Sequence, residues 1–286
     1  MASPVIDMHT HADFYALLQT DDAVLEKRRQ AMGIGKNTPA SLDVIKNKMD
    51  VAGIDRICLL PVDLTTIAGF LPVSNEEIAR LVAMEPDRFI GFASVDPRRE
   101  DSRAVLEKAF GELNLAGLKL HPTRQDFCPD DPAWNWIYEL CQSYNRPVVM
   151  HTGLSYGGRG LMDPAHPLRL EAVLASHPDL RVCMAHCGWP FVREVAALLL
   201  KYPNAYTDTA CLFFDSAPEF YAHVFGKEME MTWVDRSLNR QIMFGSNYPR
   251  FEQIRMKWAL EKLPLREQTR QRILGENALI FLGGEA

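Results

Sequence analysis

The feature that most constrains the fold is an alternation of short apolar segments with helix-like segments along the whole chain. Near-continuous apolar runs are typical of parallel strands buried on both faces, and parallel strands need long crossovers such as helices. The expected strands cover residues 5–11, 57–60, 89–95, 116–121, 147–151, 180–186, 205–208 and 242–246. Eight strand–helix units most economically form a TIM (β/α)8 barrel, an α/β fold.

Local signals fix several of the expected helices. Ser41 is a suitable N-cap for a helix that runs to Ala52, and Gly53 is a suitable stop. Ser74 and Glu77 have the spacing of a capping box. Further helical segments are expected at 101–113, 131–145, 167–176 and 191–201, with a less regular one at 217–237.

No Gly/Ser-rich or Pro-rich linker interrupts this alternation, so we expect one TIM-barrel domain over residues 1–286. The rival fold is a doubly wound open sheet. That fold would place a Gly-rich phosphate-binding turn after the first strand. This chain has His9 and His11 there instead.

Charge and hydropathy exclude several classes of function. The net charge of −6, without a basic block, indicates no nucleic-acid partner. No apolar run approaches the roughly 18 residues that a membrane span needs, and the first residues lack a signal-peptide pattern. We therefore expect a cytoplasmic protein. Its six cysteines form no CxxC pair and are expected to be mostly buried hydrophobic residues.

Five of the eight histidines follow the pattern of an active site. His9 and His11 end the first expected strand, and His121, His151 and His186 end the fourth, fifth and sixth. Side chains at positions i and i+2 of a strand share a face, so His9 and His11 should converge on one point. The carboxyl ends of barrel strands are where TIM-barrel enzymes build their sites. The pattern predicts a metal or catalytic site.

Motifs around these histidines occur in a recognisable order. They are DMHTH at 7–11, GLKLHP at 117–122, HTG at 151–153, AHCG at 185–188 and FGSNYP at 244–249. Together they resemble the amidohydrolase superfamily. The similar branch contains aminocarboxymuconate-semialdehyde decarboxylase, aromatic-acid decarboxylases and many metal-dependent hydrolases. The resemblance spans nearly the whole chain and implies a TIM barrel with one divalent metal ion.

By this resemblance, His9, His11 and His151 are metal ligands, and zinc is the expected ion because it accepts imidazole nitrogen readily. His186 is then the catalytic residue that polarises the substrate or moves a proton beside the metal. The strand-eight motif normally has aspartate as a ligand and base, where this chain has Asn247. We retain Asn247 as a candidate metal ligand and catalytic residue, although its neutral amide has no useful basicity.

Several residues near these positions suit an anionic substrate. Lys119 shares a strand face with His121, and Arg124 and Arg159 lie in the loops that follow. Cationic groups of this kind bind carboxylates through charge-assisted hydrogen bonds. Trp189 is expected to line an apolar part of the pocket. Lys119 is not expected to be a ligand, because the similar branch works with one ion.

The first functional hypothesis is metal-dependent hydrolysis of an amide, ester or lactone bond in a small carboxylated molecule. Non-oxidative decarboxylation of an aromatic or muconate-like acid at the same site is an alternative. A metal- or ligand-binding barrel without turnover is another, because Asn247 replaces the family aspartate. A homodimer is the default expectation for the assembly.

Overall fold

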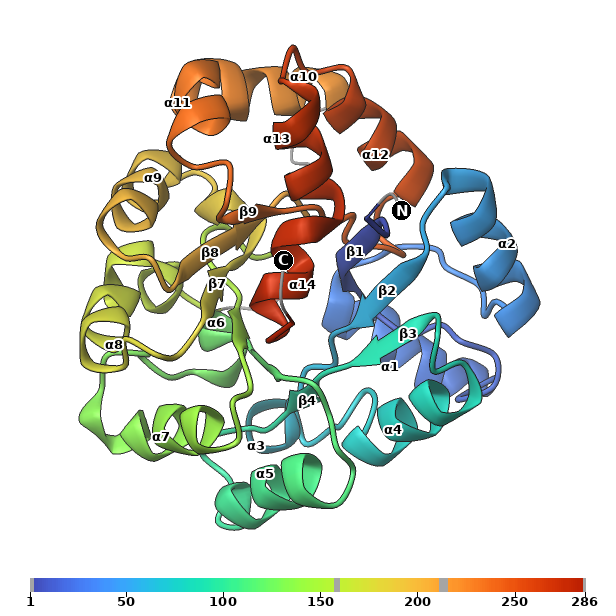
Figure 1. The fold of residues 1–286 in the computed structure, drawn as a ribbon. Helices are drawn as coiled ribbons and strands as arrows, with labels where there is room; N and C mark the ends of the chain where they lie inside the picture. The colour runs from blue at the N-terminus through green and yellow to red at the C-terminus, as the bar shows by residue number, and fades with distance from the viewer. Residues whose placement is uncertain (1–2, 157–159, 211–215, 285–286) are drawn as a thin grey trace.

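A computed structural model describes residues 3–156, 160–210 and 216–284 of the chain, which form a ring of parallel strands surrounded by helices (Figure 1). The expected strands are all present, although the third is divided into β3 and β4. The strands are β1 (Ile6–Thr10), β2 (Arg56–Leu59), β3 (Phe89–Gly91), β4 (Ala93–Ser94), β5 (Leu118–Leu120), β6 (Val148–Met150), β7 (Val182–Met184), β8 (Ala205–Asp208) and β9 (Ile242–Met243).

Backbone hydrogen bonds close the strands into a barrel. The pairing order is β1-β2-β3 and then β4 to β9 in sequence, and these neighbouring strands pair in parallel. The third strand divides at Phe92, whose N–H bonds to β2, while the next N–H, of Ala93, bonds to the carbonyl of Gly117 before β5. The N–H of Met8 donates to the carbonyl of Phe244 and joins β1 to the last strand. The TIM-barrel prediction is therefore confirmed.

The helices begin and end largely where the sequence predicts. Ser41 and Gly53 cap α2, and Ser74 and Glu77 form the expected capping box of α4. The expected segment at 217–237 is broken, because a π-helical turn, η5 (Val224–Glu228), separates α10 from α11.

The α-helices are α1 (Asp22–Met32), α2 (Leu42–Ala52), α3 (Thr65–Ala68), α4 (Asn75–Met84), α5 (Ser102–Gly111), α6 (Pro122–Gln125), α7 (Asn135–Ser143), α8 (Glu171–Ser176), α9 (Val192–Lys201), α10 (Ala217–His223), α11 (Met231–Arg236), α12 (Gln253–Glu261), α13 (Glu267–Gln271) and α14 (Asn277–Phe281). Short 3-10 turns are η1 (Pro132–Trp134), η2 (Asp163–Ala165), η3 (Pro167–Leu170) and η4 (Ala185–Gly188), and a second π-helical turn is η6 (Arg272–Glu276). None of these described helices has the length and apolar character needed to cross a membrane.

The first strand contains an irregularity that matters for the site. Asp7 pairs with Ile57 and Thr10 pairs with Leu59, so β1 uses one residue more than β2 between the two pairs. Such an extra residue is a β-bulge, which interrupts the strict alternation of side chains between the two faces.

The bulge allows neighbouring residues of β1 to serve two layers of the barrel. Ile6 and Met8 pack into a buried cluster with side chains from the other strands. His9 and His11 line the pocket at the carboxyl ends of the strands. A regular strand would direct Met8 and His9 to opposite faces. Because of the bulge, Met8 can face the apolar interior of the barrel while the next residue, His9, faces the pocket.

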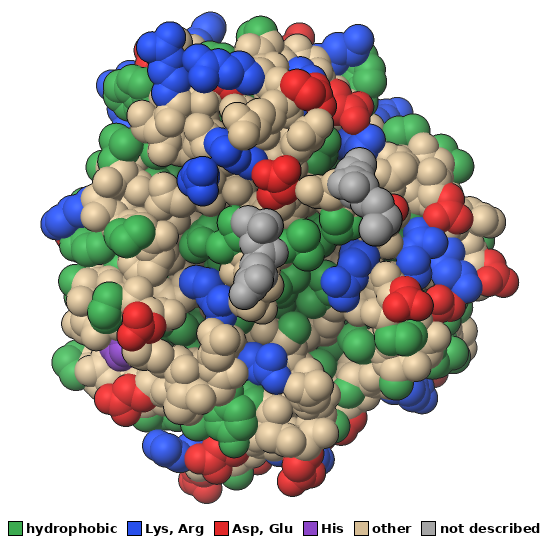
Figure 2. Space-filling view, viewed as in Figure 1, with side chains coloured by type: hydrophobic (Ala, Val, Ile, Leu, Met, Phe, Trp, Pro, Cys, Tyr) green, Lys and Arg blue, Asp and Glu red, His purple; other side chains and the backbone are tan. Residues whose placement is uncertain are grey.

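The end of the barrel opposite this pocket is closed by α14. Ala278 and Phe281 belong to the same buried cluster as Ile6 and Met8, and the Phe281 ring lies 5.1 Å from that of Tyr206. In Figure 1 this helix lies across the middle of the barrel. Figure 2 shows acidic and basic side chains interspersed around the same face. Because α14 covers this end, the open end of the barrel is the one at the carboxyl ends of the strands.

Candidate active site

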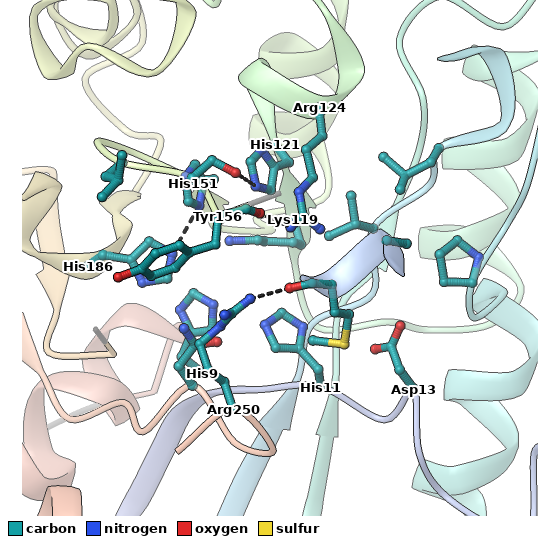
Figure 3. A pocket seen from close by; sticks show the side chains of 18 residues that line it. His9, His11, Asp13, Lys119, His121, Arg124, His151, Tyr156, His186 and Arg250 are labelled. Atoms are coloured by element: carbon teal, nitrogen blue, oxygen red, sulfur yellow. Dashed lines mark hydrogen bonds between the residues drawn. The ribbon is translucent and has the colours of Figure 1, made fainter. Parts of the chain in front are cut away.

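A pocket at the carboxyl ends of the strands collects nearly all of the predicted site residues (Figure 3). The histidines from β1, β5, β6 and β7 surround it, and the ring centroids of His9 and His186 are 4.6 Å apart. The predicted residues that line the pocket are His9, His11, Lys119, His121, Arg124, His151, His186 and Asn247. Strand ends that are distant in sequence thus supply one shared site.

For two predicted residues, Trp189 and Arg159, the structure gives no position in the lining of this pocket. Trp189 is not among the described residues that line this pocket. Its ring lies 6.3 Å from that of Phe220, and its carbonyl accepts a hydrogen bond from Leu154. The structure therefore gives no support to Trp189 as a pocket residue, because the indole packs in the neighbouring core. Arg159 lies outside the described residues.

The orientation of three histidines is set through their Nδ1 atoms. His9 Nδ1 lies 2.8 Å from the Asp208 carboxylate, and His11 Nδ1 lies 2.7 Å from the carbonyl of Leu60. Because both partners are acceptors, each Nδ1 carries the proton and each Nε2 keeps its lone pair. His151 Nδ1 lies 3.0 Å from His186 Nε2, so these two nitrogens share one proton.

Burial keeps these imidazoles neutral. Removal from water places the pKa of His9, His151 and His186 well below the usual range, with smaller contributions from neighbouring positive charge. The pKa of His11 is lowered to about 3 by burial and then by Lys119. Neutral imidazole is the form that binds metal ions.

The donor chemistry of His9, His11 and His151 suits a divalent metal ion, although the described residues whose ligand atoms all lie within 4.8 Å of one another are His9, His186 and Asp208. Within the described part of the chain, the buried Nε2 of His151 has no hydrogen-bond partner, as expected of an atom that awaits a ligand. The bonded Nδ1 atoms of His9 and His11 leave Nε2 as their ligand atom. Metal-binding histidines commonly bond through the other nitrogen to a carboxylate or a backbone carbonyl. Three such imidazoles with an open position are typical of catalytic zinc sites.

Sequence reasoning missed Asp208, the last residue of β8. Atoms of His9, His186 and Asp208 lie within 4.8 Å of one another, a spacing that would also suit metal ligands. However, the Asp208 carboxylate already accepts from His9 Nδ1 and from the backbone N–H groups of His186 and Ala210. Asp208 therefore acts better as a support for the histidines than as a ligand. Its position at a strand end was the available signal.

The same carboxylate supports an unusual backbone turn. His186 has a φ of 65° and Cys187 a φ of 50°, in the left-handed region that side chains other than glycine seldom adopt. The N–H of His186 donates to Asp208 Oδ1 at 2.8 Å. This bond helps to hold the His186 ring against His9 and His151.

Asn247 reaches the pocket from the loop after β9. Its N–H donates to the carbonyl of His9, and its φ of 61° suits asparagine, which enters the left-handed region more readily than most residues. Asp7 anchors the preceding residue, since its carboxylate accepts hydrogen bonds from the N–H and hydroxyl of Ser246. Asn247 is therefore held beside β1, where it offers a neutral amide.

Lys119 is a buried cation that lines the pocket. Figure 3 shows its side chain extending between the upper histidines, His121 and His151, and the lower ones, His9 and His11. Among the described residues, its buried Nζ has no hydrogen-bond partner. Burial lowers the pKa of Lys119 to about 8, although the charge of Asp208 opposes the shift. At pH 7 the side chain is mainly an ammonium ion.

His121 is a neighbour of the predicted ligands. Its ring stacks on that of His151, with centroids 3.7 Å apart and an interplanar angle of 10°. His121 Nε2 lies 3.4 Å from the hydroxyl of Ser155. Burial and the charge of Arg124 place the pKa of His121 well below its usual range. His121 is thus a neutral wall of the pocket rather than a cation.

Three further lining residues were missed by sequence reasoning, namely Asp13, Tyr156 and Arg250. Asp13 follows the histidine pair in sequence, and in Figure 3 it lies on the far side of His11 from His186. Burial raises the pKa of its carboxyl to about 6. Arg250 lies three residues after Asn247, and this spacing alone does not predict that its side chain lines the pocket.

The amino-acid sequence matches the amidohydrolase family model over residues 6–284. The chain belongs to the amidohydrolase family. This amidohydrolase is 25% identical over 255 residues to 2-amino-3-carboxymuconate-6-semialdehyde decarboxylase of Dictyostelium discoideum, an alignment that covers 78% of this chain and 68% of the relative. The branch inferred from the sequence motifs is thereby confirmed.

Solved structures of low sequence identity share the fold of this amidohydrolase. An uncharacterised TIM-barrel protein from Bordetella bronchiseptica superimposes with a TM-score of 0.78 at 23% identity, covering 98% of this chain and 99% of that one. For 5-carboxyvanillate decarboxylase of Sphingomonas paucimobilis the TM-score is 0.68 at 15% identity, covering 99% and 100%. The chain thus has the barrel fold of an enzyme family, and the choice between hydrolysis and decarboxylation depends on the residues of its own site.

Proposed function

We propose that this amidohydrolase removes carbon dioxide from a small unsaturated or aromatic carboxylic acid without net oxidation. The observation that carries the proposal is the neutral Asn247 in a pocket whose centre holds the Lys119 ammonium. Hydrolysis needs a base that takes a proton from water, and an amide is not one. Decarboxylation needs a cation that binds the substrate carboxylate and a group that donates a proton, and Lys119 would serve as both.

The nearby carboxylates do not replace the missing base. Asp208 accepts hydrogen bonds from His9, His186 and Ala210. Asp13 lies on the other side of His11 from His186 (Figure 3). The decarboxylase names of the Dictyostelium and Sphingomonas proteins support the same choice.

His9, His11 and His151 would hold a divalent ion through Nε2, with the Asn247 amide beside them. Such an ion acts as a Lewis acid that stabilises negative charge on a substrate oxygen. Zinc remains the expected metal because of the imidazole-rich ligand set.

The protein groups have separate tasks in the proposed reaction. Since His151 Nδ1 donates to His186 Nε2, His186 Nδ1 carries a proton, and among the described residues it has no partner. That N–H would donate to a substrate oxygen. Lys119 would hold the reacting carboxylate by a charge-assisted hydrogen bond. When the C–C bond breaks, carbon dioxide leaves and the electron pair stays on the substrate carbon, which takes a proton from Lys119 Nζ.

Isotope labelling distinguishes the three functional hypotheses. We expect aromatic or muconate-like acids incubated with the enzyme in D2O to release carbon dioxide and gain one deuterium at the former carboxyl carbon. Lys119→Gln should strongly reduce both signals, whereas the exposed-site variant Arg103→Gln should not. Incorporation of 18O from labelled water into an ester, lactone or amide substrate, without carbon dioxide, would instead establish hydrolysis. Tight ligand binding with neither signal would indicate a barrel without turnover.

A further inference from the structure

Asp13 is a buried carboxylate in the pocket that the proposed reaction does not use. It lines the pocket, and only 5% of its surface is exposed. Figure 3 shows its side chain on the far side of His11 from His186, with the carboxylate turned toward the interior of the pocket. A molecule bound in this pocket can therefore meet Asp13 at the end remote from His186.

The oxygens of this carboxylate are left without a donor by the surrounding side chains. Of the charged groups, Arg28 exerts the largest attraction on Asp13, but its Nη1 donates at 2.8 Å to the backbone carbonyl of Asp13 and not to the carboxylate. Among the described residues, no other side chain donates a hydrogen bond to these oxygens. Buried polar groups are nearly always paired, so an exception in the wall of a pocket indicates a place for a ligand.

Nearby cations balance the charge of Asp13 without occupying its oxygens. Arg28 is buried as well, with 3% of its surface exposed, and Arg124 adds a smaller attraction. Positive charge at this range favours the ionised form of a buried carboxyl group. The carboxylate is therefore compensated in charge and lacks a hydrogen-bond donor.

The part of the pocket that follows the next strand is apolar. β1 pairs with β2, and Val62 and Leu64, which follow β2, line the pocket together with Pro72. These side chains offer no hydrogen bonds. Ligand sites commonly combine apolar walls with a few polar groups that fix orientation and specificity, and Asp13 is placed to be such a group.

We propose that Asp13 is a specificity-determining residue that accepts a hydrogen bond from a donor group at the end of the substrate remote from the reacting carboxylate. The substrate class is then an unsaturated or aromatic acid with a distal hydroxyl or amino group, and without a second carboxylate at that position. This inference rests on the proposed function for the place of the reacting carboxylate beside Lys119.

Asp13 should act on these two kinds of substituent in opposite directions. A hydroxyl group donates a charge-assisted hydrogen bond to the carboxylate, which is stronger than a bond between neutral groups. A second carboxylate would instead meet a like charge in a buried setting. A methyl group has a size similar to that of hydroxyl and does neither, so it separates these effects from the filling of space.

Calorimetric titration of the enzyme as purified tests this discrimination. The donor probes are 3-hydroxybenzoate and 4-hydroxybenzoate, which cover two spacings, and the matched probes are the corresponding methylbenzoates and benzenedicarboxylates. We expect the better hydroxybenzoate to bind at least about tenfold more tightly than the methylbenzoate of the same geometry, since hydrogen bonds to charged groups are among the stronger ones.

Two variants of Asp13 locate the preference. Asp13→Leu should remove the advantage of hydroxyl over methyl while methylbenzoate still binds. Asp13→Asn keeps an accepting oxygen, so part of the hydroxyl preference should remain. The same variant should bind the benzenedicarboxylate at least about threefold more tightly than the unaltered enzyme does, because the like charge is gone. A gain of this kind cannot come from a damaged fold.

The matched control is Asp63→Asn. Asp63 is buried, and its carboxylate bonds to Thr65 and Arg99. That variant should leave the ratio of hydroxybenzoate to methylbenzoate affinity unchanged. Equal affinities of these two ligands in the unaltered enzyme would overturn the proposal. Equal weakening of all three kinds of ligand in Asp13→Asn would also overturn it, since Asp13 would then only maintain the pocket.

The outcome can be separated from that of the labelling experiment. A hydroxyl preference that depends on Asp13, without carbon dioxide release from any acid, would support the role of Asp13 and reject the proposed reaction. Carbon dioxide release from hydroxybenzoates and methylbenzoates with equal efficiency and equal affinity would support the reaction and reject the role of Asp13.

Discussion

Asp208 and His9 form the support of the proposed metal site, with 2.8 Å between Asp208 Oδ2 and His9 Nδ1. Both side chains are buried, with relative exposures of 1%. The other carboxylate oxygen accepts from the N–H of His186 at 2.8 Å. The Asp208 side chain on β8 therefore sets the tautomer of His9 on β1 and orients the backbone of His186, two residues after β7.

Replacing Asp208 should weaken metal binding. In Asp208→Asn only one oxygen remains, so it cannot serve both His9 and the backbone N–H of His186. If the amide NH2 faces His9, the imidazole proton moves to Nε2 and blocks the ligand lone pair. We expect a loss of roughly 10–100-fold in metal affinity, measured by competition with a chelator.

The matched control is Asp63→Asn, because Asp63 is also buried and bonds outside the pocket to Thr65 and Arg99. That variant should keep its metal affinity even if its thermal stability falls. Unchanged metal affinity in Asp208→Asn would contradict the supporting role.

Restoring a carboxylate at position 247 should alter metal binding and substrate binding in opposite directions. Asn247 has a φ of 61°, which aspartate also tolerates. Asn247→Asp adds an anionic oxygen, so we expect tighter metal binding but a higher KM for a carboxylate substrate. If a latent hydrolase remains, ester or lactone hydrolysis should rise at least roughly tenfold, since general-base catalysis is worth about 10²–10⁴. Chelator competition and steady-state kinetics measure these effects.

The rate should depend on the protonation of Lys119. Burial lowers the pKa of this ammonium to about 8, so the charged form is present below pH 8 and is lost above it. A divalent ion bound nearby would lower this pKa further, so we expect kcat/KM for a carboxylate substrate to fall at or below about pH 8, because kcat/KM reports the free enzyme. Lys119→Gln should have lower activity and lack this decline. A profile that stays level to pH 9.5 would contradict the assignment.

Gly153 should be irreplaceable for steric reasons. Its φ is 82°, and a Cβ there would lie 2.1 Å from the carbonyl oxygen of Trp189. Gly153→Ala should lower the free energy of unfolding by roughly 2–5 kcal/mol through backbone strain and overpacking. Thermal denaturation should show a clear fall in Tm. Gly35→Ala is the control, since a Cβ at Gly35 meets nothing within 4 Å, and its Tm should change little.

The sequence by itself determined the fold and much of the site. Helix caps such as Ser41 and Ser74 act through contacts a few residues away, so their effect can be read locally. Parallel strands place their carboxyl ends at one end of a barrel, which allowed His9, His151 and His186 to be assigned to one site. These inferences need only short-range rules and the order of the strands.

Tertiary structure alone decided how the site is supported and charged. The carboxylate of Asp208 lies 199 residues from His9 in sequence, and its bond to that imidazole depends on the register of β8 in the closed barrel. Tyr156 joins Arg124 to Arg250 only because two loops meet above the strand ends. Such contacts leave no periodic or local pattern, since they arise from packing between segments that the sequence separates.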